Sequence, residues 1–123
     1  MSRERLPDRR RAVNIDFRHV TPDGASVPFR ATLGYYHDGR LGEVFLQSSK
    51  IGTDADVAIK DAAILLSFAL QHGCTVEDVR LAMTRSAAGA PEGAIGTLID
   101  LIANLPPEPP LSPATPDRPS ANI

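Results

Sequence analysis

The chain has 123 residues, a hydrophobic content of 42% and a formal net charge of −2, which fits one globular domain with a single core. Its lone cysteine, Cys74, excludes an intramolecular disulfide and favours a reducing compartment. The charged first residues lack the apolar run of a signal peptide, and no apolar segment approaches the ~20 residues that span a bilayer. We therefore expect a cytoplasmic protein without membrane contact.

Residues 1–11 form a basic leader. They hold five arginines against two acidic residues, so this segment is positive while the remainder is acidic. A basic tail on an acidic body can contact nucleic acid or an acidic partner, and Arg9, Arg10 and Arg11 are the candidate contacts. The alternative is a flexible, solvated leader that keeps the chain soluble, since no aromatic residue is interleaved for base stacking.

Alternating hydrophobicity predicts three strands in the N-terminal half. Residues 12–19 and 27–36 alternate cleanly, whereas residues 41–47 do so less cleanly because three apolar residues are consecutive. Pro-Asp-Gly at 22–24 and Asp-Gly at 38–39 are turn signals between them. The pattern predicts a three-stranded antiparallel meander.

The hydrophobic period changes near Ile51. A long helix is expected over residues 54–72, with Thr53 as its N-cap. Its apolar positions form a stripe that we expect to be widened by two further residues: Ile59, Ala62, Ala63, Leu66 and Leu70, then Leu65 and Phe68. So broad an apolar surface predicts burial on more than one side.

Two shorter helices should follow, over residues 75–84 and 94–105. The fold class is therefore α+β, with helices layered on one face of a three-stranded sheet in the order β-β-β-α-α-α. Seven prolines in the last 18 residues predict a disordered tail over 106–123, which leaves residues 12–105 as the domain. Residues 1–8 and those after Pro107 should be dispensable for folding.

The residue types give no catalytic constellation. His19, His37 and His72 fall on separate elements, and none has a second metal ligand at a suitable spacing. Cys74 lies too close to His72 along the chain for good nucleophile geometry, so it is more simply a packing residue. We expect no catalytic residue, no metal site and no cofactor.

One loop has the chemistry of an anion site. Residues 48–53 place hydroxyls, Lys50 and Gly52 just before a helix N-terminus, where free N–H groups and the helix dipole favour an anion or nucleotide. Thr53 completes this candidate site. In the alternative interpretation Lys50 is a solvated loop residue and Thr53 is only a cap.

Several runs resemble a known family. Residues 36–46 contain Asp-Gly-Arg-Leu-Gly-Glu-Val-Phe, a Lys-Ile-Gly loop follows at 50–52, and residues 61–73 end in Leu-Gln-His-Gly. Their order and spacing are similar to the C-terminal region of adenosylcobalamin-dependent (class II) ribonucleotide reductases, known as the TSCPD domain. The similarity covers about residues 6–85. It implies a role near deoxyribonucleotide synthesis.

The sequence departs from that family in its signature motif and in its cysteines. The Thr-Ser-Cys-Pro-Asp signature is absent, and the nearest stretch is Thr84-Arg85-Ser86. The reductase's catalytic cysteines belong to a large barrel domain that 123 residues cannot contain, and its terminal cysteine pair is missing as well. The resemblance therefore links this chain to ribonucleoside-diphosphate reductase without implying turnover.

We therefore expect a TSCPD-like accessory module that has no activity of its own. It would act through a protein partner, such as a reductase, or through a nucleotide or phosphate. The broad apolar helix predicts a homo-oligomer. The alternative function is a small nucleic-acid-binding protein that uses Arg9, Arg10 and Arg11, and its affinity would fall steeply with salt.

Overall fold

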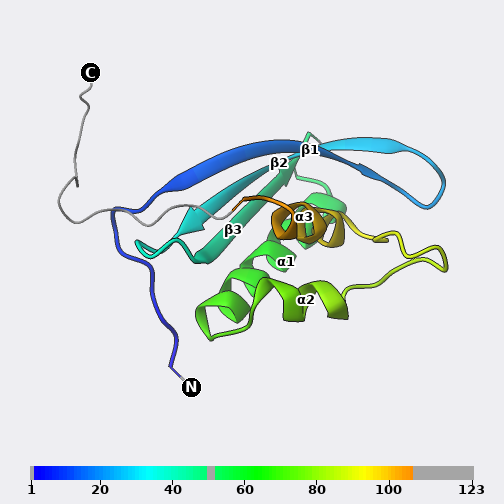
Figure 1. Ribbon diagram of the computed structural model, residues 1–123. Coiled ribbons are helices and arrows are strands. Elements are labelled where there is room, and N and C mark those ends of the chain that lie inside the picture. Colours follow the sequence, from blue (N-terminus) through cyan, green and yellow to red (C-terminus); the bar gives the residue numbers. More distant parts are fainter. Residues whose placement is uncertain (1, 50–51, 107–123) are drawn as a thin grey trace.

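A computed structural model describes residues 2–49 and 52–106 of the chain. Three strands precede three helices, which confirms the α+β fold predicted from the sequence: β1 (Ala12–Val20), β2 (Ser26–Tyr35), β3 (Leu41–Ser48), α1 (Asp54–Gln71), α2 (Val76–Ala82) and α3 (Ala94–Ala103). Figure 1 shows the strands as one twisted layer, with α1 and α3 on the same side of it. The expected Pro-rich tail lies outside the described residues.

The sheet is an antiparallel meander in the order β1-β2-β3. Gly24 and Gly39 adopt φ of 92° and 94° in the two turns, a conformation that glycine adopts without steric cost. β3 ends at Ser48, opposite Phe29, whereas the pairing of β1 with β2 continues to Val20 opposite Ser26. The β1–β2 hairpin therefore projects beyond the end of β3.

One face of the sheet supplies half of the core. Its inward residues alternate as predicted, and they pack with buried side chains of α1 and α3: Phe17, Phe29, Ala31, Leu33, Tyr35, Val44 and Leu46 from the strands, and Ala63, Leu66, Leu70, Ala94, Leu98 and Ile99 from the helices. β3 alternates more cleanly than expected, because Phe45 is 54% exposed between buried Val44 and Leu46. This places an aromatic ring on the open face of the sheet.

The structure corrects the expectation that α1 is buried on more than one side. Leu65 is 70% exposed and Phe68 is 41% exposed, so neither widens the buried stripe. The physical reason is the packing partner: α1 lies along β3, makes few contacts with α3, and α2 packs mainly on α3. Among the described residues, the elements that pack on α1 cover mainly its side facing β3.

The N-terminal segment also differs from the expected solvated leader. Residues 3–10, here called the N-terminal strap, run over the domain from the end of α1 to β3. The Glu4 N–H donates to the carbonyl of Gln71 at 2.8 Å. The Arg10 guanidinium makes two hydrogen bonds to the Glu43 carboxylate, at 2.7 and 3.2 Å. Arg10 thus pairs with an acid of the domain, which carries the excess negative charge of the chain.

Within the described part of the chain, no helix combines the length and the apolar character needed to cross a bilayer.

Candidate functional site

The predicted anion loop is only partly visible, because Lys50 lies outside the described residues. Gly52 has φ of 86°, in the left-handed region that favours glycine. The Thr53 hydroxyl accepts the backbone N–H of Asp56 at 3.1 Å, so Thr53 is the N-cap of α1 as expected.

An internal carboxylate occupies the positive end of α1. Asp56 is 1% exposed, and it accepts the Gly52 N–H at 3.1 Å and the Ser48 hydroxyl at 3.3 Å. The Lys60 ammonium lies 3.0 Å from the same carboxylate. The Gly52 N–H, followed by Lys60, lowers the pKa of Asp56 to about 2. An external anion would therefore compete with this side chain, and the anion role of Lys50, Gly52 and Thr53 stays a prediction.

Sequence reasoning treated Asp56 as an ordinary first-turn acid and missed its burial. A lysine four residues later was the available signal, since Lys60 reaches back one turn to Asp56. The contact with Ser48 depends on how β3 meets α1, which no local pattern reports.

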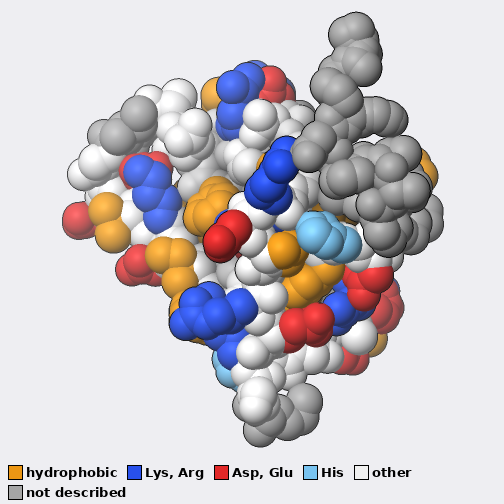
Figure 2. Space-filling model, turned by 90° about the vertical axis from the view of Figure 1, so that its left-hand side faces the viewer, with side chains coloured by type: hydrophobic (Ala, Val, Ile, Leu, Met, Phe, Trp, Pro, Cys, Tyr) orange, Lys and Arg blue, Asp and Glu red, His pale blue; other side chains and the backbone are white. Residues whose placement is uncertain are grey.

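The three leader arginines already have partners. Arg10 is held by Glu43, and its guanidinium also donates to the carbonyl of Pro7 at 2.6 Å. Arg9 and Arg11 are engaged as well. Figure 2 views the end of the molecule that carries this segment, and basic side chains there are interspersed with acidic and apolar ones. The nucleic-acid role of Arg9, Arg10 and Arg11 stays a prediction.

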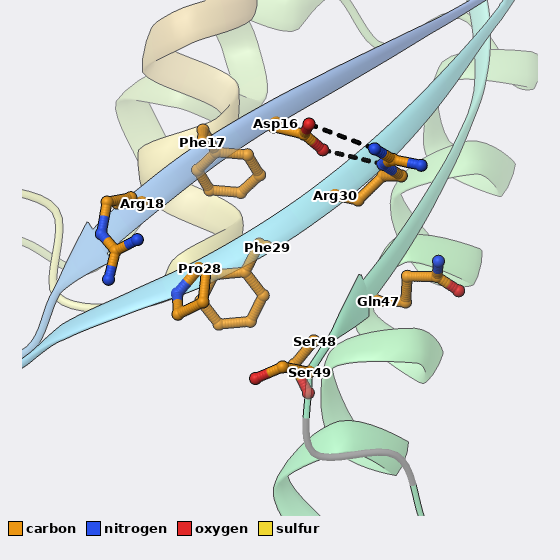
Figure 3. Close-up of a pocket in the computed structure, with 9 residues that line it drawn as sticks. All are labelled: Asp16, Phe17, Arg18, Pro28, Phe29, Arg30, Gln47, Ser48 and Ser49. Carbon is orange, nitrogen blue, oxygen red and sulfur yellow. Dashed lines mark hydrogen bonds and ion pairs between the residues drawn. The ribbon is translucent and has the colours of Figure 1, made fainter.

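A groove opens where β3 leaves the sheet. Because β1 and β2 continue past Ser48, the space beside them is open over a volume of about 470 Å³. We call it the sheet-end groove, and Figure 3 shows the residues that line it: Asp16, Phe17, Arg18, Pro28, Phe29, Arg30, Gln47, Ser48 and Ser49.

The sheet-end groove combines stacked rings with two exposed guanidinium groups. The rings of Phe17 and Phe29 lie 5.6 Å apart and are stacked. Arg30 donates to the Asp16 carboxylate at 2.7 Å, and this hydrogen bond lowers the pKa of Asp16. Arg18 donates to the Ser26 hydroxyl at 2.7 Å. Such a surface can bind a ligand with an anionic group. No cluster of three or more potential metal ligands occurs among the described residues.

A second exposed feature lies on α1. Four large apolar side chains, here called the apolar stripe of α1, are exposed on its uncovered side, with the exposed Asp61 between the first and the other three: Val57, Ile64, Leu65 and Phe68. Their spacing of seven, eight and eleven residues from Val57 places them on one side of a helix. The Arg3 guanidinium lies 4.3 Å above the Phe68 ring, so the N-terminal strap touches one end of the stripe.

Comparison with known proteins connects this chain with a large enzyme. The chain is 36% identical over 76 residues to a vitamin B12-dependent ribonucleotide reductase of Bradyrhizobium diazoefficiens, and the match covers 62% of this chain. A vitamin B12-dependent ribonucleotide reductase of Agrobacterium fabrum is 34% identical over 82 residues, or 67% of this chain.

In both relatives the matched part is small, since the chain spans about 6% of the length of each. No family model and no solved structure matches the chain. The resemblance to vitamin B12-dependent reductases is thus confirmed, whereas its assignment to the TSCPD domain stays a prediction. The chain is similar to one small segment of a vitamin B12-dependent ribonucleotide reductase.

Proposed function

We propose that this chain is a non-catalytic, TSCPD-like accessory module that binds the polypeptide of a vitamin B12-dependent ribonucleotide reductase. The observation that carries the proposal is the apolar stripe of α1. Monomeric proteins rarely expose contiguous large apolar patches without a binding role. In the relatives the similar segment is covalently continuous with a far longer chain, so a reductase polypeptide is the natural occupant of this surface.

The arrangement of the described histidines supports a binding role over catalysis. The ring nitrogens of His37 and His72 lie 2.8 and 2.9 Å from backbone carbonyls, and His19 is buried against the Thr97 hydroxyl at 2.8 Å. None of these contacts joins a histidine to Cys74 or to a carboxylate, whereas an acid–base or nucleophilic pair needs such a contact.

A binding measurement with purified proteins tests the proposal. The full chain is titrated into the reductase of Bradyrhizobium diazoefficiens in a calorimeter, alongside the Leu65→Asp variant. We expect a complex that Leu65→Asp weakens at least tenfold, because a charge would enter a dehydrated apolar contact. Val20→Asp is the matched control, since Val20 is 62% exposed on the hairpin, away from α1. It should bind like the wild type.

Two outcomes would overturn the proposal. One is the absence of any complex at micromolar concentrations of the folded chain. The other is a stripe that serves self-association instead: light scattering would then give a dimer for the wild type and a monomer for Leu65→Asp, with no effect of this variant on reductase binding.

A further inference from the structure

The two outer edges of the sheet differ in how their backbone groups are bound. β3 is one edge, and side chains of α1 reach its outward groups. The Ser67 hydroxyl accepts the Val44 N–H at 2.8 Å, and Gln71 donates to the carbonyl of Gly42 at 2.8 Å. α1 thus covers the edge of β3, which is one way in which proteins prevent an edge strand from pairing with another chain.

β1 is the other edge, and its outward backbone groups are open. Its odd-numbered residues bond to β2, since the Tyr35 N–H donates to the carbonyl of Arg11 at 3.0 Å and the pairing continues from there without a bulge. The N–H and C=O groups of the even-numbered residues therefore point out of the sheet. Among the described residues, no hydrogen bond reaches these groups at Asn14, Asp16 or Arg18. The strand is nine residues long and has no proline, glycine or lysine to discourage pairing.

The core-facing side of β1 also has apolar surface left for a neighbour. Phe17 is buried, whereas Val13 and Ile15 on the same face are only half-buried. They lie on the outermost strand, so nothing in the sheet covers them from that side. A further strand at this edge would extend the core over both.

We propose that a second copy of this chain occupies the edge, with the two β1 strands antiparallel and the two-fold axis at Phe17. The outward backbone groups of each copy then bond to those of the other, and two three-stranded sheets become one of six strands. The same surface is used twice, as in any two-fold dimer. The helices of both copies lie on the same side of the joined sheet. This proposal is independent of reductase binding through the apolar stripe of α1.

The charges along the edge favour a second copy and fix its register. With the axis at Phe17, Asp16 lies directly opposite Arg18 of the second copy, and by symmetry this contact occurs twice. Opposite charges at directly paired positions stabilise a sheet, whereas like charges there destabilise it. A shift of two residues in either direction would place Asp16 opposite itself or Arg18 opposite itself. The edge is therefore complementary to itself in one register.

Both side chains can make the new contact and keep their present ones. Arg18 donates to the hydroxyl and the carbonyl of Ser26 through two of its nitrogens, and its guanidinium has further N–H groups for a carboxylate. Asp16 pairs with Arg30, but its side chain is 69% exposed. A carboxylate has enough lone pairs to accept from two guanidinium groups. Asp16 can thus lie between Arg30 of its own chain and Arg18 of the second copy.

Light scattering on the full chain, after size-exclusion chromatography, tests the proposal. At about 100 µM we expect a dimer that dissociates on dilution, because a strand edge buries a small area. Asp16→Arg and Arg18→Asp each place like charges at both contacts, so each variant alone should dimerise at least tenfold more weakly. An equal mixture of the two variants should form a heterodimer, because opposite charges then face each other at both contacts.

Two further variants are controls. Asp61→Arg makes the same change of charge as Asp16→Arg, but at an exposed position of α1, and it should dimerise like the wild type. Leu65→Asp should also remain a dimer, because it lies in the apolar stripe of α1. Failure of the β1 pairing is therefore separate from failure of reductase binding.

The proposal is overturned if the wild type is a monomer at about 500 µM, if the charge variants dimerise as the wild type does, or if their mixture stays monomeric. Amide hydrogen exchange gives a second measurement. The N–H groups of Asp16 and Arg18 should be protected in the wild-type dimer and should exchange freely on dilution. Protection of these groups in a monomer would assign the edge to another segment of the same chain, and this too would overturn the proposal.

Discussion

The Asp56 carboxylate contacts the end of β3, the loop that follows it and the next turn of α1. It accepts hydrogen bonds from Gly52 and from Ser48 at the end of β3, and it pairs with Lys60 on α1. A buried carboxylate with these partners is stabilised as the anion. This single residue therefore secures the passage from the sheet to the first helix.

Asp56 should give the domain a distinct sensitivity to acid. Its pKa of about 2 in the fold is below the ordinary value of 3.8. Its contribution to stability is thus fully present above roughly pH 4 and is lost as the pH falls through about 2. We expect Asp56→Asn to lower the thermal midpoint by roughly 5–10 °C at neutral pH.

Thermal melts from pH 7 to pH 2 check this expectation. The gap between the wild type and Asp56→Asn should narrow below pH 4, because the unfolded wild-type chain then takes up a proton at Asp56 while the folded protein keeps this carboxylate ionised until about pH 2. A gap that stays constant with pH would show that the ionised carboxylate does not stabilise the fold.

At the scale of elements, the N-terminal strap is a structural part of the domain. Leu6 and the Tyr36 ring pack so closely on Gly42 that an added Cβ there would lie 2.6 Å from the ring. Gln71 on α1 donates to the carbonyl of Gly42 at 2.8 Å and accepts from Arg3. The strap therefore connects the end of α1 with β3.

Removing the strap's main ion pair should destabilise the domain. The Glu43 side chain is only 14% exposed, so Arg10→Ala leaves a carboxylate half-buried and unpaired. We expect the free energy of unfolding to fall by about 1 kcal/mol, which lowers the thermal midpoint by roughly 5 °C. The expected effect is kept this small because solvent screens the partly exposed arginine.

Arg5→Ala is the control for that change, because Arg5 is exposed and carries the same charge. It should melt within about a degree of the wild type. Equal stability of both variants would mean that the ion pair between Arg10 and Glu43 does not stabilise the domain.

For the whole molecule, the sheet with helices on one face depends on α3 as well as α1. Leu98 and Ile99 are almost completely buried, whereas Leu101 on the same helix is partly exposed. α3 therefore forms one side of the hydrophobic core.

Truncation at two positions of α3 tests that architecture. Leu98→Ala should reduce the free energy of unfolding by about 2–5 kcal/mol, because it opens a cavity in the core. Leu101→Ala should cost less than about 1 kcal/mol. Urea denaturation measures both. Equal costs would mean that α3 does not pack on the sheet in the observed orientation.

The sequence by itself determined the strands, the turns and the start of the long helix. Alternation around Phe29 and Leu33 follows from the pleat of a strand, and the glycines at 24 and 39 follow from the backbone of tight turns. Thr53 could be identified as a cap because capping involves only residues three positions away. These features depend on neighbours along the chain.

Only the tertiary structure decided what those elements bring together. Leu65 and Phe68 looked like core residues, because hydrophobicity reports a capacity for burial and not the presence of a neighbouring element. Asp16 and Arg30 face each other only through the register of β1 and β2, and Arg10 finds Glu43 across 33 positions. Such contacts join residues far apart in the chain, so they depend on strand pairing and helix orientation, which no local pattern encodes.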